Sequence, residues 1–279
     1  MLSSTIATFL AIAAADVALG QSFSRCNPQL RDGCPPNSAF GNQRASCDLV
    51  QGTCGVFTPS AGTTTITHGV NGAAFKIEEQ TDAPTIETPK YIFFGKFEVD
   101  IQAAPGPASS PAPFSSPTIS TRYIDWEIIG SDNARVQTNY FSKGNTSTYD
   151  RGKFHNVSNP TGSAHRYTIE WTKTQLVWSI DGEPVRTLLA KDCKAGTSSG
   201  FPQTPMQIKL GTWVAGKPGS AQGTIDWAGG YADWSKKPFV AYYKSVTIID
   251  YAGGDGPGRA ATQYVYGDKT GTWESIRVQ

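Results

Sequence analysis

The stretch YIDWEIIG, residues 123–130, alternates between polar and apolar side chains. This period of two is that of a β-strand, on which successive side chains point to opposite faces. Tyr123, Asp125 and Glu127 are therefore expected on one face. The apolar residues between them are expected to fill the other face: Ile124, Trp126 and Ile128. Two acidic side chains on one strand face fit either a solvated surface or acid–base chemistry, and the stretch alone favours neither.

The same alternation recurs along the chain, whereas helical periodicity is nearly absent. Asp181-Gly182 lies between two such stretches and predicts a tight hairpin, because both turn positions favour positive φ. Many strands joined by polar turns predict an all-β sandwich or jelly roll. The expected strands cover residues 93–101, 123–129, 135–141, 167–171, 175–180, 185–189 and 239–251, the last being the longest.

The start of the chain is typical of a secreted protein. Residues 1–20 are expected to be a signal peptide, because their apolar run is too short to span a bilayer and ends at small residues. A buried core helix is the alternative. The end of the chain, up to Gln279, has no apolar run of the kind that signals a lipid anchor.

The cysteines also indicate an oxidising compartment. Four of them cluster after the signal peptide and are expected to form disulfides: Cys26, Cys34, Cys47 and Cys54. Cys193 is then the unpaired thiol. Zinc is the competing ligand, but the chain has no CxxC pair and its three histidines are scattered. We expect a disulfide-tied lead-in over residues 21–55 and one β-domain over residues 56–279.

The composition argues against one class of binding partner and suggests another. The net charge is +1, and no basic stretch interleaves with aromatic residues, which argues against nucleic acid. Seven Trp and eleven Tyr accompany few charged residues. This surplus of aromatic rings suggests a β-sandwich that stacks on sugars.

Several further stretches carry a resemblance to a known family. They are CNP at 26–28, VQTNYF at 136–141, TYDRG at 148–152, FPQTPM at 201–206, GTIDWAGG at 223–230 and YVYGDKTGTW at 264–273. With residues 123–127, they resemble the Crh-type fungal cell-wall transglycosylases of glycoside hydrolase family 16. The resemblance runs in order through nearly the whole mature chain.

The resemblance implies a concanavalin-like β-jelly-roll sandwich with a glycan cleft on its concave sheet. It implies retaining transfer by two carboxylates, without a cofactor or metal, in which Glu127 is the acid/base and Asp125 the assisting carboxylate. It also implies a secreted cell-wall protein, expected to be a monomer without a membrane span, that cleaves a chitin-like β-1,4 glycan and joins it to β-glucan.

Sugar-binding candidates follow from the matching motifs, since glycan sites combine aromatic platforms with polar side chains. They are Gln137, Asn139, Tyr140, Trp213, Trp227 and Asp233. For each Trp, packing in the core is the alternative. Tyr149, Arg151 and His155 could form a structural hydrogen-bond cluster. Asn145-Thr146-Ser147 and Asn156-Val157-Ser158 are glycosylation sequons.

The nucleophile position departs from the family. Family members carry Glu where this chain has Tyr123, and a phenol with an ordinary pKa of about 10 stays largely protonated at neutral pH. A tyrosine nucleophile needs a partner that activates it, and Glu127 already serves as acid/base. The chain as it stands is therefore expected to lack transfer activity.

The segment before Tyr123 departs as well. Residues 105–117, PGPASSPAPFSSP, lack any strand pattern. Read from the third base of each codon, residues 107–123 permit Gly-Ile-Val-Ser-Ser-Ala-Val-Leu-Gln-Ser-Asp-Asp-Leu-Asp-Glu-Ile, which matches the family pattern GIVSSxVLQSDDLDE. We interpret residues 107–123 as translated out of frame, through a misplaced splice junction, a sequencing error or a divergent allele, with the family frame resuming at Ile124. A Pro-rich loop insertion is the alternative.

Two expectations follow from this departure. Residues 108–121 should not form a packed central strand, because prolines cannot donate to a sheet, and a gap should remain beside Asp125 and Glu127. Three functions stay open: a transglycosylase, a non-catalytic β-glycan-binding protein, which Tyr123 favours, and a β-glucan hydrolase.

Overall fold

The computed structural model describes Cys26, residues 28–60, 66–105, 115–121, 124–143, Thr148, and residues 150–194 and 200–279, with the side chains of 115–121 excluded. The expected signal peptide lies outside these residues. Helix is confined in the described part to α1 (Gln222–Trp227) and three 3-10 turns, η1 (Ala190–Asp192), η2 (Trp234–Lys236) and η3 (Trp273–Ser275). None of the described helices has the length and hydropathy to cross a membrane.

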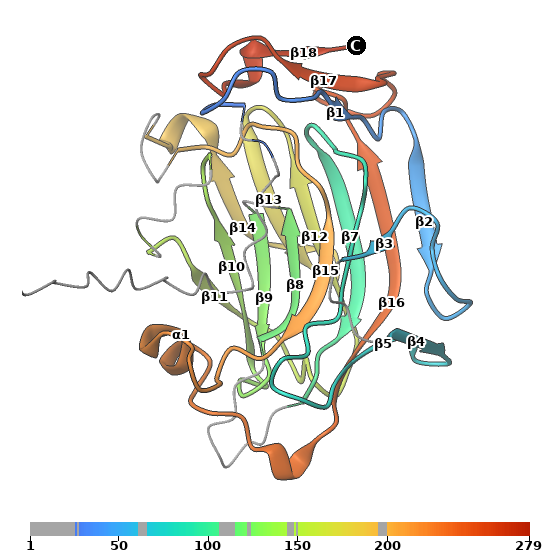
Figure 1. Ribbon diagram of the computed structural model, residues 1–279, viewed down its shortest axis with the longest axis vertical. Helices are drawn as coiled ribbons and strands as arrows, with labels where there is room; N and C mark the ends of the chain where they lie inside the picture. Colours follow the sequence, from blue (N-terminus) through green and yellow to red (C-terminus); the bar gives the residue numbers. More distant parts are fainter. Residues whose placement is uncertain are drawn as a thin grey trace, which may run out of the picture.

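Two large antiparallel sheets lie face to face, as Figure 1 shows. The front sheet has the order β11 (Lys153–Asn156), β10 (Arg135–Tyr140), β9 (Ile124–Ile129), β8 (Ser115–Thr121), β15 (Lys209–Trp213), β6 (Thr85–Glu87) and β3 (Thr58–Pro59). The back sheet has the order β14 (Glu183–Leu189), β13 (Gln175–Ile180), β12 (His165–Trp171), β7 (Gly95–Gln102), β16 (Phe239–Asp250), β5 (Gly72–Ile77) and β4 (Ile66–Gly69). The predicted all-β jelly-roll sandwich is confirmed.

The core lies between the two sheets and is built by strand alternation. On β7, every second residue is buried, so Phe97, Val99 and Ile101 face the core. From the front sheet, Trp126 reaches across and donates from Nε1 to the Thr168 carbonyl oxygen of β12 at 3.3 Å. Buried aromatic rings of this size supply much of the apolar area that stabilises a sandwich.

The predicted hairpin and the longest strand are confirmed. Asp181 and Gly182 join β13 to β14 with φ of 51° and 91°, the left-handed conformations that this turn requires. β16 has 12 residues and pairs along its length with β7, β5 and β2 (Arg44–Asp48). Because β2 pairs with β16, part of the expected lead-in belongs to the sandwich.

The expected gap beside β9 is a wrong prediction. β8 lies between β9 and β15 and pairs with both, so the front sheet is continuous there. The register of β8 against β9 shifts between Ser116 and Ile119, a bulge that contains Pro117. A bulge releases a residue from the ladder, which is how a strand accommodates a residue without an N–H. Residues 108–114 lie outside the described residues.

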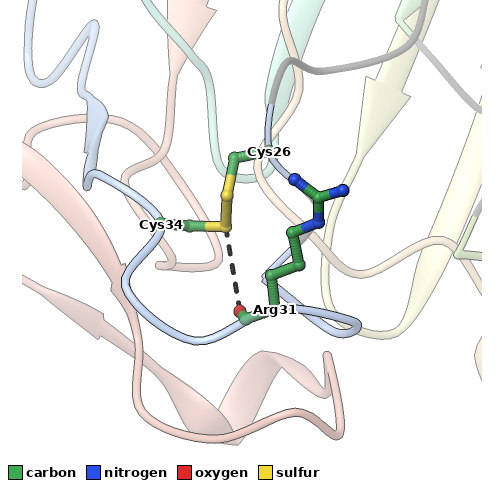
Figure 2. The surroundings of a disulfide bond; sticks show 3 residues. All are labelled: Cys26, Arg31 and Cys34. Atoms are coloured by element: carbon green, nitrogen blue, oxygen red, sulfur yellow. Dashed lines mark hydrogen bonds between the residues drawn. A yellow bond between two sulfur atoms is a disulfide. The ribbon is translucent and has the colours of Figure 1, made fainter.

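Disulfides tie the beginning of the fold. Cys26 bonds to Cys34 and Cys47 to Cys54, while Cys193 is free, as predicted. In Figure 2 the Cys26–Cys34 bridge closes a loop in which the Cys34 sulfur lies 3.8 Å from the Arg31 carbonyl oxygen. The same loop and β17 line a small hollow, which includes no residue of β9 or β10.

A small third sheet joins distant parts of the chain. It consists of β1 (Asn37–Ser38), β17 (Gln263–Tyr266) and β18 (Ile276–Val278), at the top of Figure 1. Beside it, the buried carboxylate of Asp250 accepts hydrogen bonds from the backbone N–H groups of Gly41, Phe93 and Ala252 and from the Tyr264 hydroxyl. Burial raises the pKa of Asp250, although these donors oppose the shift.

Candidate active site

The two acidic residues of β9 share the outer face of the front sheet, as predicted from the alternation. Ile124, Trp126 and Ile128 are fully buried in the core, whereas Glu127 is partly exposed. Asp125 is on the Glu127 face but only 8% exposed. The charge of Glu127 also acts through the sheet: after burial itself, it contributes to raising the pKa of Tyr243 in the core.

Two amide side chains lie directly beside these acids. In the register of β10 against β9, Gln137 is opposite Glu127 and Asn139 is opposite Asp125. Directly opposed residues of an antiparallel pair point to the same face, with Cβ atoms about 4.5–5.5 Å apart. The structure thus brings together four of the predicted site residues in two adjacent rows.

Two tryptophans extend this group. Trp227, at the end of α1, donates from Nε1 to Gln137 Oε1 at 3.0 Å. Its ring is roughly parallel to that of Trp213 on β15, with centroids 6.5 Å apart and an angle of 20° between the planes. Both rings are partly exposed. Gln137, Trp213 and Trp227 therefore form one connected polar–aromatic wall beside Glu127.

The local sequence explains why α1 stops where it presents Trp227. The helix is followed by Gly229 and Gly230, with φ of 86° and 116°. A Cβ on Gly229 would lie 2.7 Å from Ser131 Oγ, and that hydroxyl donates to the Ala228 carbonyl oxygen at 3.0 Å. Glycine therefore permits the close approach that fixes the helix end on the β9–β10 turn.

The other two sugar-binding candidates lie elsewhere. Tyr140 points to the opposite face of β10 from Asn139, is 6% exposed, and packs against Trp178 and Arg186 in the interior. Asp233 caps η2, where its Oδ1 accepts from Ser235 N–H and Oγ–H at 3.1 and 2.7 Å. Those Ser235 bonds lower the pKa of Asp233. Core packing and capping account for these two positions.

Tyr123 lies outside the described residues. So does Arg122, and these two residues link β8 to β9. The assignment of the nucleophile position to Tyr123 therefore stays a prediction.

A side chain of the back sheet supports β10 from behind, and the sequence analysis did not predict this contact. Arg186 of β14 crosses the sandwich and donates to the Thr138 carbonyl oxygen at 3.1 Å, to Thr138 Oγ1 at 2.8 Å and to the Arg151 carbonyl oxygen at 2.9 Å. Thr138 lies between Gln137 and Asn139 and is fully buried. Burial lowers the pKa of Arg186. Nothing in the local sequence of β14 reports a partner on another sheet.

The suggested structural cluster is confirmed for two of its three members. Arg151 donates to the Tyr140 carbonyl oxygen at 2.8 Å and to Thr148, and His155 Nε2 lies 2.8 Å from Thr138 Oγ1. Tyr149 lies outside the described residues. Within the part of the chain that the structure describes, no group of three or more His, Cys, Asp or Glu side chains is placed to hold a metal ion.

A family model and two relatives of known family match this chain. The model of glycosyl hydrolases family 16 matches residues 56–229. Crh-like protein 5 of Aspergillus fumigatus is 43% identical over 259 residues, which are 92% of this chain and 62% of that protein. Crh-like protein 1 of the same fungus is 42% identical over 96% of this chain and 70% of its own length. The chain thus spans only part of these relatives.

Solved structures agree in fold. A Crh5 transglycosylase in complex with NAG superposes with a TM-score of 0.80 and 41% identity, covering 91% of this chain and all of that one. A Bacillus licheniformis β-glucanase, at 19% identity, has a TM-score of 0.55 over 74% of this chain and 97% of its own. The second likeness concerns the fold alone.

Proposed function

This chain belongs to glycosyl hydrolase family 16 and, within it, to the Crh-type transglycosylases, and from that premise we propose that the outer face of β9 is where a β-linked glycan is cleaved and transferred. The observation that carries the proposal is the register of Glu127 with Gln137 and of Asp125 with Asn139 on one face. Acids for proton transfer thus lie beside amides that can hold sugar hydroxyls.

The proposed reaction, in a protein that carries the family's nucleophilic Glu, has two steps. A carboxylate attacks the anomeric carbon, while the protonated Glu127 gives its proton to the leaving sugar oxygen, so that the glycosidic C–O bond breaks and a glycosyl ester forms. A hydroxyl of the acceptor glycan then attacks the same carbon, its proton passes to Glu127, and the nucleophile leaves as a carboxylate. Asp125 tunes both neighbours by hydrogen bonding and charge. The reaction requires no metal or cofactor.

The donor is proposed to be a chitin-like β-1,4 glycan and the acceptor a β-glucan. The likeness to a transglycosylase solved with NAG supports the donor class. The rings of Trp213 and Trp227 are partly exposed and suit the apolar faces of sugars. We also propose that the chain is secreted to the cell wall, acts as a monomer and loses residues 1–20. The disulfide-tied lead-in over residues 21–55 then adds β2 to the back sheet of the catalytic β-domain over residues 56–279.

The nucleophile is proposed to be missing from the chain as it stands. Tyr123 occupies its position, and a frame shift over residues 107–123 accounts for both this tyrosine and the Pro-rich segment. The chain would then bind glycan without transferring it. If the Glu of the shifted reading is followed directly by Ile124, the family's Glu-Ile-Asp order is restored and that Glu lies two residues before Asp125. Retaining transfer needs two carboxylates about 5–5.5 Å apart.

A transfer assay tests the proposal. Labelled chito-oligosaccharide and β-glucan are incubated with the frame-restored protein, which should produce labelled β-glucan, and with the chain as it stands, which should not. Glu127→Gln in the restored protein should abolish transfer from an unactivated donor and leave binding largely intact. The matched control is Glu98→Gln, which removes a carboxylate paired with Lys96 at 3.0 Å on the back sheet and should transfer normally.

Other outcomes distinguish the rival functions. Near-normal turnover of Glu127→Gln would contradict the assignment of Glu127 as the acid/base. Free sugars without a transferred product would indicate a β-glucan hydrolase. Binding without turnover in the restored protein would indicate a non-catalytic glycan-binding protein. Sequencing the genomic DNA and the transcript across residues 105–125 tests the frame directly, and agreement of both with the present sequence would reject the artefact.

A further inference from the structure

Phe154 is an exposed aromatic residue on the outer face of the front sheet. It lies on the edge strand β11, opposite Gln137, and is 43% exposed. The Arg135 guanidinium lies over its ring at 4.6 Å from the centroid. Arg135 is itself held by Asp132, at 2.7 Å from Nε to Oδ2. Part of the ring is therefore open to a further group although one cation already contacts it.

Two residues further along the same strand is the asparagine of a sequon. Asn156 is exposed, and residues i and i+2 of a strand share a face, with Cα atoms roughly 6.6 Å apart. Its cross-strand partner is Arg135. The Asn156 side-chain amide makes no hydrogen bond in the part of the chain that the structure describes. Ser158, the hydroxyl residue of the sequon, is exposed as well.

We propose that Asn156 carries an N-linked glycan whose first sugar packs on the Phe154 ring and accepts hydrogen bonds from Arg135. The apolar C–H face of an N-acetylhexosamine fits the open ring, and its acetamide and hydroxyl oxygens fit the guanidinium donors. This assignment explains why a large aromatic side chain is exposed beside a free amide. Of the proposed function, it rests only on passage through the secretory pathway.

The modification is an ordinary group transfer. The Asn156 amide nitrogen attacks the anomeric carbon of an oligosaccharide that is linked through pyrophosphate to a lipid. The new C–N bond replaces the C–O bond to the pyrophosphate, which leaves with the lipid, and the amide nitrogen loses one proton. The first sugar, packed on Phe154, would then stand at the β11 edge of the face that carries Glu127, in the row that contains Gln137, whereas its attachment point Asn156 is in the row of Arg135.

The test uses the full chain secreted from a fungal host behind a supplied leader, so that it does not depend on residues 1–20. All proteins carry Ser147→Ala, which leaves Asn156 as the acceptor. Peptide mass spectrometry measures occupancy at Asn156, and an endoglycosidase trims the glycan to one sugar. Thermal midpoints are then compared for this protein and for Ser158→Ala, each with Phe154 and with Phe154→Ala.

We expect occupancy of Asn156, and a midpoint roughly 2–4 °C lower for Ser158→Ala than for the single-sugar protein. Phe154→Ala should remove most of this difference, since the sugar then loses its platform. An unoccupied Asn156 in secreted protein would overturn the proposal, as would an equal difference with and without the ring. If Phe154→Ala instead weakens binding of chito-oligosaccharide while Asn156 is unoccupied, the ring is a substrate platform. None of these readouts depends on transfer activity.

Discussion

Arg186 offers a test of how the back sheet supports the strand that carries Gln137 and Asn139. Arg186→Met keeps an unbranched apolar stem but removes the guanidinium with its charge and all its donors. The substitution deletes three hydrogen bonds to Thr138 and Arg151. It also deletes cation–π contacts at 4.7 Å to Trp178 and 5.3 Å to Tyr140.

The magnitude follows from these contacts. A hydrogen bond from a charged donor contributes about 1.5–3 kcal/mol, and each cation–π contact about 0.5–1 kcal/mol. The sum overstates the loss, because all the bonds end on one guanidinium and are coupled. We therefore expect the free energy of unfolding to fall by about 3 kcal/mol, which lowers the thermal midpoint by roughly 6–10 °C.

Urea unfolding followed by Trp fluorescence measures the effect, provided that the m-value is unchanged. Arg186→Lys should lose an intermediate amount, because a point-like ammonium cannot reach all the acceptors of the planar fork. The matched control is Arg166→Met, which breaks a pair with Asp100 at 2.8 Å from a side chain that is 54% exposed. That control should lose no more than about 1 kcal/mol. If Arg186→Met is no more costly than Arg166→Met, the support does not exist.

Three further predictions follow from the described contacts. Burial, followed by the charges of Arg186 and Lys153, lowers the pKa of His155 below 6.5, so the unfolded state binds more protons and the free energy of unfolding should decrease as pH falls below 6.5; His155→Gln should flatten this dependence in urea titrations from pH 7 to pH 5. Cys47→Ser with Cys54→Ser opens a loop of sequence separation 7 and should cost about 2.5 kcal/mol, whereas mass spectrometry that finds four free thiols in secreted wild-type protein would contradict the pairing. Gly152→Ala puts a Cβ 2.8 Å from Gln137 Nε2 and should displace that amide from Trp227, raising the calorimetric Kd for chito-oligosaccharide about five-fold; an unchanged Kd would remove Gln137 from the site.

Local alternation was enough to predict that the two acidic candidates on β9 share one face of the sheet. Asp125 and Glu127 differ by two positions, so any regular strand places them on one face. The same alternation predicts that Tyr140, one position beyond Asn139 on β10, points into the core instead of toward the site, as the structure shows. Motif membership suggested Tyr140, and strand parity decides against it.

Other features depend on contacts that no local pattern reports. Arg186 meets Thr138 across the sandwich, at a separation of 48 residues. Residues 108–121 were expected to fail as a strand because of their prolines, yet a bulge between Ser116 and Ile119, which contains Pro117, lets the backbone of β8 pair on both sides. Pairing with two neighbouring strands is a tertiary effect, and it outweighs an unfavourable local sequence.

The small sheet and the hydrogen bonds of Asp250 join residues synthesised early to residues synthesised late, so they can form only after most of this chain has been made. β17 pairs with residues 37–38 on one side and 276–278 on the other, and Asp250 receives donors from Gly41, Phe93 and Tyr264. In a nascent chain, Asp250 therefore lacks its Tyr264 donor and β1 lacks its partner strand until residues 263–278 leave the ribosome. The early disulfides can close long before that moment, so the slow step in forming this part of the fold is expected to be the docking of β17 and β18 rather than the oxidation of the first cysteines.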